Sequence, residues 1–132
     1  MSESPNFWDA VFEIRLFDQS YAEDAYAFVV EALEHTIRGI GVERHVSGAE
    51  LVGGVCACAK GRFGLLAWTV LERWGIRSTG DVGAIVFQLI DAGVLSRQES
   101  DSRADFDDLF DLRVVLEDQY FEAPPAGAQD SA

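Results

Sequence analysis

Apolar residues recur every three or four positions along most of the chain, which is the spacing that buries one face of an α-helix. Capping signals divide this pattern, because a serine followed three residues later by an acid favours the start of a helix. Such pairs occur at three places: Ser20 with Glu23, Ser47 with Glu50, and Ser78 with Asp81. The pattern predicts helices over residues 7–16, 21–38, 48–60, 65–74, 79–92 and 112–121, the last of them capped by Asp111.

The predicted helices differ in how their apolar residues are distributed. The helix over 21–38 carries a narrow apolar stripe opposite a face of acids, and the stripe consists of Tyr26, Val29, Val30, Leu33 and Ile37. The helix over 48–60 is apolar on all sides, so we expect it at the centre of the fold. Its small residues predict that a second helix packs closely against it, and they are Gly53, Gly54, Ala57 and Ala59.

The first helix and the tryptophans give further core candidates. Phe7, Val11 and Ile14 share one face of residues 7–16. The three tryptophans lie in apolar helical surroundings and are predicted to belong to the core: Trp8, Trp68 and Trp74. An exposed tryptophan would instead indicate a surface that binds a partner.

The second half of the chain has the order of elements of a winged helix, in which a helix-turn-helix precedes a β-hairpin. The segments "VLSRQE" and "FDDLFDL" flank a polar turn, and the even spacing of Phe106 and Phe110 is typical of one strand face. The predicted fold is therefore α+β, mainly α-helical, with a winged-helix-like second half (helix-turn-helix plus β-hairpin). An unrelated α+β domain with short helices is the alternative, and residues 39–46 are a candidate for one further strand.

Length and composition favour one globular domain over residues 1–122, followed by a disordered Pro/Ala-rich tail over 123–132. The N-terminus lacks the pattern of a secretory signal, and no apolar run approaches the roughly 18–20 residues that span a membrane. Cys56 and Cys58 are too close for an unstrained disulfide and are expected as buried thiols. These features predict a cytoplasmic protein.

The chain is strongly acidic, with 23 Asp and Glu against 10 Lys and Arg and a net charge of −13. Lys60 is the only lysine. Many carboxylates with few lysines suit a cytoplasm at molar salt, where a Debye length of about 3 Å screens their repulsion. This halophilic interpretation predicts that the fold is lost at low ionic strength. The alternative is an ordinary acidic protein from a GC-rich genome, in which arginine codons displace lysine.

The charge is uneven, since residues 51–97 are net +2 while the flanking regions are net −7 and −8. The basic residues Arg73, Arg77 and Arg97 are therefore candidate nucleic-acid contacts. They flank the helix over 79–92 rather than line it, and that helix begins with Ser78, Thr79 and Asp81 instead of the Arg, Lys, Asn or Gln that read base edges. Nucleic-acid binding is accordingly the less favoured function.

Candidate chemistry is sparse. His45, Ser47 and Glu50 lie close in sequence, but Ser47 and Glu50 are explained as a capping box and His45 is then alone. His35 is placed separately, and the acidic segment "ESDSRADFDD" lacks the glycine and final glutamate of a calcium loop. No catalytic residue, metal ligand or cofactor is predicted.

Four segments carry a resemblance: "YAEDAYAFVVEALEHT" (21–36), "RHVSGAELVGGV" (44–55), "FGLLAWTVLERWGIRSTGDVGAIVFQLIDAGVL" (63–95) and "ESDSRADFDDLFDL" (99–112). Together they resemble an uncharacterised conserved hypothetical protein family found mainly in Verrucomicrobia and Planctomycetes. The resemblance implies a single-domain bacterial protein. It implies no activity, cofactor or catalytic residue, because none is assigned to that family.

These observations favour a non-catalytic cytoplasmic protein-interaction or self-associating module of winged-helix-like shape, whose partner is a protein or a second copy. A winged-helix nucleic-acid-binding regulator is the alternative. An enzyme of unknown class, centred on His45, is a weaker one.

Overall fold

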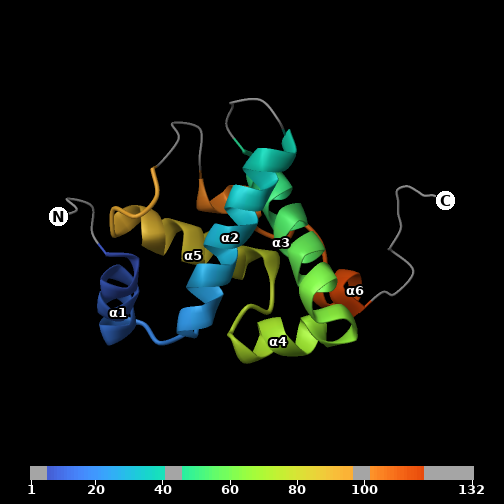
Figure 1. Ribbon diagram of the computed structural model, residues 1–132, viewed down its shortest axis with the longest axis horizontal. Coiled ribbons are helices and arrows are strands. Elements are labelled where there is room, and N and C mark those ends of the chain that lie inside the picture. The colour runs from blue at the N-terminus through green and yellow to red at the C-terminus, as the bar shows by residue number, and fades with distance from the viewer. Residues whose placement is uncertain (1–5, 41–45, 97–101, 118–132) are drawn as a thin grey trace.

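The computed structural model describes residues 6–40, 46–96 and 102–117, and every regular element in these ranges is helical (Figure 1). In chain order the elements are α1 (Phe7–Phe17), α2 (Glu23–Ile40), α3 (Gly48–Phe63), the 3-10 turn η1 (Gly64–Leu66), α4 (Ala67–Arg73), α5 (Thr79–Asp91), the 3-10 turn η2 (Arg103–Phe106) and α6 (Leu112–Glu117). The six predicted α-helices are therefore present, with bounds shifted by a few residues.

The antiparallel pair α2 and α3 forms the centre of the molecule (Figure 1). A Cβ atom at Gly54 would overlap the side-chain oxygen of Thr36, so only glycine lets the two helices come this close. Gly53 has open space around it and has no such role. Because α3 borders α2, α4, α5 and α6 as well as both 3-10 turns, the prediction that it is central is confirmed.

The core prediction for α2 is correct at one end of the helix and wrong at the other. Tyr26 and Val29 are fully buried, whereas Ile37 is 45% exposed. Trp68 and Trp74 pack against the core as predicted. Trp8 does not, because half of its surface is exposed.

The turn between α4 and α5 packs against the linker between α1 and α2. Gly75 has φ +99°, and a Cβ there would overlap the carbonyl oxygen of Ser20. Ala22 N–H also donates to the Trp74 carbonyl at 3.0 Å. The predicted capping box of Ser20 with Glu23 is wrong, since α2 begins only at Glu23 and Ser20 N–H donates to Asp18 Oδ1 at 2.9 Å.

The prediction of a β-hairpin, and with it the winged-helix-like α+β fold, is wrong: the described residues contain no strand. Ser102 and Asp105 instead form a capping box that starts η2. The Thr79 hydroxyl donates to the Phe106 carbonyl at 2.7 Å, and Phe106 packs so tightly on Gly83 that a Cβ there would clash. The Phe106 carbonyl and the Leu109 N–H are thus bonded to Thr79 of α5 rather than to a partner strand.

Several predictions fall partly outside the described residues. Val94 belongs to the turn that closes α5, where its N–H donates to the Leu89 carbonyl at 2.9 Å, but the predicted strand continues into residues 97–101, which are not described. Residues 41–45 of the candidate strand 39–46 and the predicted tail 123–132 also lie outside. Asp111 caps α6 as predicted, since its carboxylate accepts from Arg113 N–H at 3.1 Å, and the predicted continuation of α6 to residue 121 lies beyond the described part.

The stretch Gly48–Arg73 is long and apolar enough, by length and composition alone, to be a candidate membrane span. It is not one straight rod, because it comprises α3, η1 and α4, and Gly64 with φ +57° separates α3 from α4. The 16 residues of α3 extend about 24 Å, less than the roughly 30 Å of a hydrocarbon core. One face of α3 also belongs to the protein core.

Candidate functional site

Helix α1 is attached to the body by one face only. The Asn6 side chain caps it by accepting from Trp8 N–H at 2.8 Å, and Ala10 and Val11 are its buried residues. On the outer side, Trp8, Phe12 and Leu16 follow one another at four-residue spacing and are 50%, 61% and 59% exposed. We call these three residues the apolar row of α1.

A second exposed row lies beside the first. At about 100° of rotation per residue, Asp9, Glu13 and Phe17 form a line next to the apolar row. Phe17 is 92% exposed, which is the largest value among the exposed large hydrophobic residues described. The outer side of α1 therefore combines bulky apolar side chains with two carboxylates.

This second row borders a groove of about 600 Å³ between α1 and α5, which we call the α1–α5 groove. Ala10 and Ile14 of α1 also line it. Across the groove, α5 and the turn after it contribute Gln88, Asp91 and Ala92. The remaining lining residues are Asn6 and Asp18 at the two ends of α1.

The groove is acidic. Among the residues that the structure describes, its lining includes four carboxylates and no Lys or Arg: Asp9, Glu13, Asp18 and Asp91. Arg15, the one cation on α1, is engaged elsewhere, because its Nε donates to the Tyr21 carbonyl at 2.9 Å and its guanidinium lies 3.9 Å from the Glu23 carboxylate. Cationic groups are therefore attracted to this surface and anions are repelled.

A chain of hydrogen bonds fixes the polar groups at the inner end of the groove. The Tyr26 hydroxyl donates to Gln88 Oε1 at 2.7 Å, and Gln88 Nε2 donates to Asp18 Oδ2 at 3.0 Å. Hydrogen bonds from Ser20, with a smaller contribution from Gln88, hold the pKa of Asp18 below its usual value. Burial raises the pKa of Tyr26 to about 12. At neutral pH this chain thus holds a carboxylate and a neutral phenol in place.

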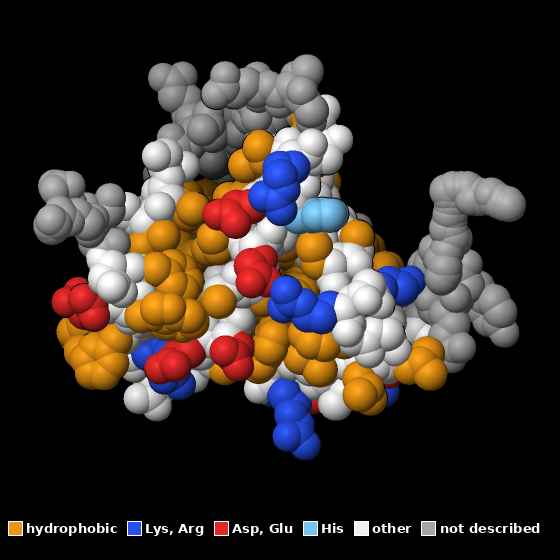
Figure 2. Space-filling model, in the orientation of Figure 1, with side chains coloured by type: hydrophobic (Ala, Val, Ile, Leu, Met, Phe, Trp, Pro, Cys, Tyr) orange, Lys and Arg blue, Asp and Glu red, His pale blue; other side chains and the backbone are white. Residues whose placement is uncertain are grey.

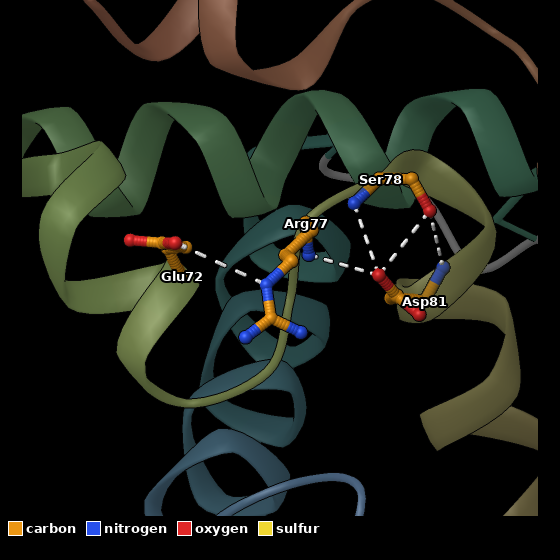
Figure 3. A network of polar contacts seen from close by, with 4 residues as sticks. All are labelled: Glu72, Arg77, Ser78 and Asp81. Atoms are coloured by element: carbon orange, nitrogen blue, oxygen red, sulfur yellow. Dashed lines mark hydrogen bonds and ion pairs between the residues drawn. The ribbon is translucent and has the colours of Figure 1, made fainter.

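The predicted basic contacts are only partly described. Arg73 and Arg77 are exposed near the turn between α4 and α5, whereas Arg97 lies outside the described residues. Figure 3 shows that Arg77 lies between acids, with Nε 4.0 Å from the Glu72 carboxylate and its N–H donating to Asp81 Oδ2 at 2.8 Å. Whether these arginines bind nucleic acid stays a prediction.

Asp81, which the sequence would place at the leading end of a recognition helix, has a structural role. Its carboxylate accepts from the Ser78 N–H at 3.0 Å, in addition to the Arg77 N–H (Figure 3). It also accepts from the Tyr21 hydroxyl at 2.6 Å. Burial and this hydrogen bond raise the pKa of Tyr21. The predicted capping box of Ser78 with Asp81 is confirmed.

The remaining candidate residues also have structural roles or lie outside the described part of the chain. Ser47 and Glu50 form the predicted capping box of α3, and His45 lies outside the described residues. Burial raises the pKa of the Cys56 thiol to about 11, so this thiol is protonated at neutral pH. Within residues 6–40, 46–96 and 102–117, no three His, Cys, Asp or Glu side chains are grouped to hold a metal ion.

No family model, curated protein or solved structure matches this chain, so the resemblance to the hypothetical family stays a prediction. We call the apolar row of α1 and the α1–α5 groove together the α1 surface. The sequence analysis did not predict this surface, although a signal for it was present. Residues 7–17 carry large apolar side chains on both faces of the helix, while a helix at the edge of a fold can bury only one of them.

Proposed function

We propose that the protein is a non-catalytic interaction module that binds a partner protein through the apolar row of α1 and the adjoining α1–α5 groove. The observation that carries the proposal is the set of four large exposed side chains on an eleven-residue helix: Trp8, Phe12, Leu16 and Phe17. Contiguous apolar surface of this kind marks interaction sites in soluble proteins.

The energetic argument follows from the residue types. Complete burial of a Leu or Phe side chain contributes roughly 1.5–3 kcal/mol, and tryptophan is among the residues that most often dominate binding energy. Because the helix and its Asn6 cap already order the backbone of the apolar row, little backbone entropy is lost when a partner covers it.

The charges define the chemistry of the partner. A segment that lies along α1 meets Asp9 and Glu13 beside the apolar row, and Asp91 across the groove. The fitting partner is therefore a protein surface with apolar side chains for the row and Lys or Arg side chains for the carboxylates. Phosphate backbones carry the wrong sign for this surface.

The test uses a pair of synthetic peptides. One is an amphipathic helix of Leu and Lys, and the other replaces every Lys with Glu. Fluorescence anisotropy should show that the cationic peptide binds and the anionic one does not. Phe12→Ser should weaken binding of the cationic peptide roughly tenfold or more, since it removes a central apolar contact.

Two further variants complete the design. The double variant Asp9→Asn with Glu13→Gln should weaken binding while leaving the apolar row intact. Ile37→Ser is the matched control, because Ile37 is a similarly exposed apolar residue on α2 outside the groove. Equal binding of both peptides, or equal binding by Phe12→Ser and the wild type, contradicts the proposal.

A further inference from the structure

Asp18 differs from the other carboxylates of the α1–α5 groove. Figure 2 shows hydrophobic side chains gathered at the end of the molecule where α1 lies, with acidic side chains beside them. Three carboxylates of the groove are exposed, and their side chains form no hydrogen bond or ion pair with other described residues: Asp9, Glu13 and Asp91. Asp18 is only partly exposed, and it accepts from Ser20 N–H at 2.9 Å and from Gln88 Nε2 at 3.0 Å. Its carboxylate is therefore held in one position.

Gln88 is anchored in the core, and this anchor determines which of its atoms faces Asp18. The hydroxyl of Tyr26, a fully buried residue, donates to Gln88 Oε1 at 2.7 Å. Because that bond is made to the amide oxygen, the amide nitrogen is left to donate to Asp18 Oδ2. Gln88 is thus a positioning residue for the Asp18 carboxylate.

The negative charge of Asp18 is not compensated within the described structure. Both of its hydrogen bonds come from neutral groups, and no described Lys or Arg forms an ion pair with it. A carboxylate offers about four acceptor positions, so a further donor can bind. A partner that covers this end of the groove without supplying a cation leaves a desolvated, unpaired charge, which is strongly unfavourable. The same carboxylate therefore accepts cationic partners and rejects neutral ones.

We infer that Asp18 is the specificity-determining residue of the α1–α5 groove and pairs with one Lys or Arg at an end of the partner's apolar stripe. The inference rests on the proposed function, in which the partner lies along the apolar row. Asp18 directly follows α1, beyond Leu16 at the end of that row, so the paired cation lies at an end of the stripe and not in its middle. The exposed carboxylates attract the partner, whereas Asp18 fixes its register.

The test uses a helical peptide with a single stripe of three leucines at four-residue spacing, which matches the apolar row in one register. Lysines lie beside the stripe and at both of its ends, so that either direction of binding is covered, and each lysine is replaced in turn by glutamine. Fluorescence anisotropy is measured at the lowest KCl concentration at which circular dichroism shows the full helix content, because salt screens ion pairs. Replacement of one end lysine should weaken binding to the wild type roughly tenfold, and replacement of each other lysine about threefold or less.

Two variants that remove the same charge from the groove are then compared. Asp18→Asn should bind the original peptide roughly tenfold more weakly and should no longer distinguish the end lysine from the others, because the ion pair is lost. Asp91→Asn is the matched control, since it removes an exposed carboxylate of the same groove. It should weaken binding about threefold or less and keep the preference for the end lysine.

A third variant tests the positioning of the carboxylate. Gln88→Met removes the amide that donates to Asp18 and leaves the charge of the groove unchanged. It should reduce the preference for the end lysine, which a purely structural role of Gln88 would leave intact.

Equal losses of affinity in Asp18→Asn and Asp91→Asn overturn the inference. A wild type for which all lysines of the peptide contribute equally also overturns it, and this result depends on no variant being folded. If the wild type binds the cationic peptide without preferring an end lysine, the role of Asp18 is rejected and the proposed function stands. If the wild type does not bind the peptide at all, both are rejected.

Discussion

Helices α1 and α5 are similar in length and in apolar content, yet they use their apolar residues in opposite ways. Both begin at a side-chain cap, Asn6 for α1 and Ser78 for α5. Six residues of the thirteen in α5 are buried, against two of the eleven in α1. The difference is positional, because α5 has α2 and α3 on one side and η2 on another, whereas α1 lies at the edge. Apolar content alone therefore does not separate a core helix from an edge helix with an exposed apolar face.

The largest expected difference in stability between the two helices comes from replacing one leucine in each with alanine. Leu89→Ala in α5 should lower the free energy of unfolding by about 2–5 kcal/mol, because Leu89 is fully buried and its loss leaves a cavity. Leu16→Ala in α1 should change it by less than about 0.5 kcal/mol, since Leu16 is 59% exposed. Chemical denaturation measures both, and equal losses would contradict the assignment of α1 as an edge helix.

A smaller loss of stability is expected when the contact between α5 and η2 is weakened. The buried Thr79 hydroxyl donates to the Phe106 carbonyl and accepts from Leu109 N–H at 3.2 Å. Thr79→Val should lower the free energy of unfolding by about 1–3 kcal/mol, because both backbone groups lose a buried partner. Thr79→Ser keeps the hydroxyl and is the control. If both variants are equally stable, this hydroxyl does not hold η2 in place.

Alkaline pH tests the hydrogen bonds by which Tyr21 of the linker and Tyr26 of α2 contact α5, and its effect is confined to high pH. The pKa values of Tyr21 and Tyr26 are raised in the folded state, to about 12 for Tyr26. Stability from the neutral phenols is therefore complete below their ordinary pKa of about 10 and is lost as pH rises toward 12. Melting temperatures between pH 9 and 12 should fall. Tyr26→Phe should make that fall shallower, and an unchanged slope would rule out Tyr26 as its source.

The smallest stability effect is expected on the apolar row of α1. Trp8→Ala should leave the melting temperature nearly unchanged, because the ring is half exposed, while it weakens binding of the cationic peptide. Differential scanning fluorimetry with an external dye measures the melting temperature, and fluorescence anisotropy measures binding of the peptide. A large drop in melting temperature would show that Trp8 is core, as its apolar surroundings in the sequence first indicated.

Local signals in the sequence predicted the helices well. The capping boxes at Ser47 and Ser78 place the starts of α3 and α5 correctly, because a cap depends on residues only three positions apart. The pair Ser102 and Asp105 has the same spacing and also caps a helical turn. The even spacing of Phe106 and Phe110 instead favoured a hairpin for this segment. In the structure the two side chains do not share a buried face, because Phe106 is buried and Phe110 is 38% exposed.

The candidate site could not be predicted in the same way. Which face of α1 is exposed depends on what packs against it. Those contacts come from α2, which follows α1 directly, and from α5, which is far away in the sequence. Phe7, Val11 and Ile14 were correctly placed on the inner face, and each packs in or against the core. The opposite face also carries large apolar side chains, beside Asp9 and Glu13. Which apolar face is buried therefore follows from tertiary structure rather than from helical periodicity.

The close approach of Gly75 to Ser20 has a consequence for how the protein can evolve. The linker that leads into α2 is held by the backbone of the turn between α4 and α5, so the placement of α1 depends partly on residues that never touch a partner. Substitutions on the outer rows of α1 can therefore accumulate without moving the helix. The proposed binding specificity could change there at little cost to folding, whereas replacement of Gly75 would displace a surface that it does not contact.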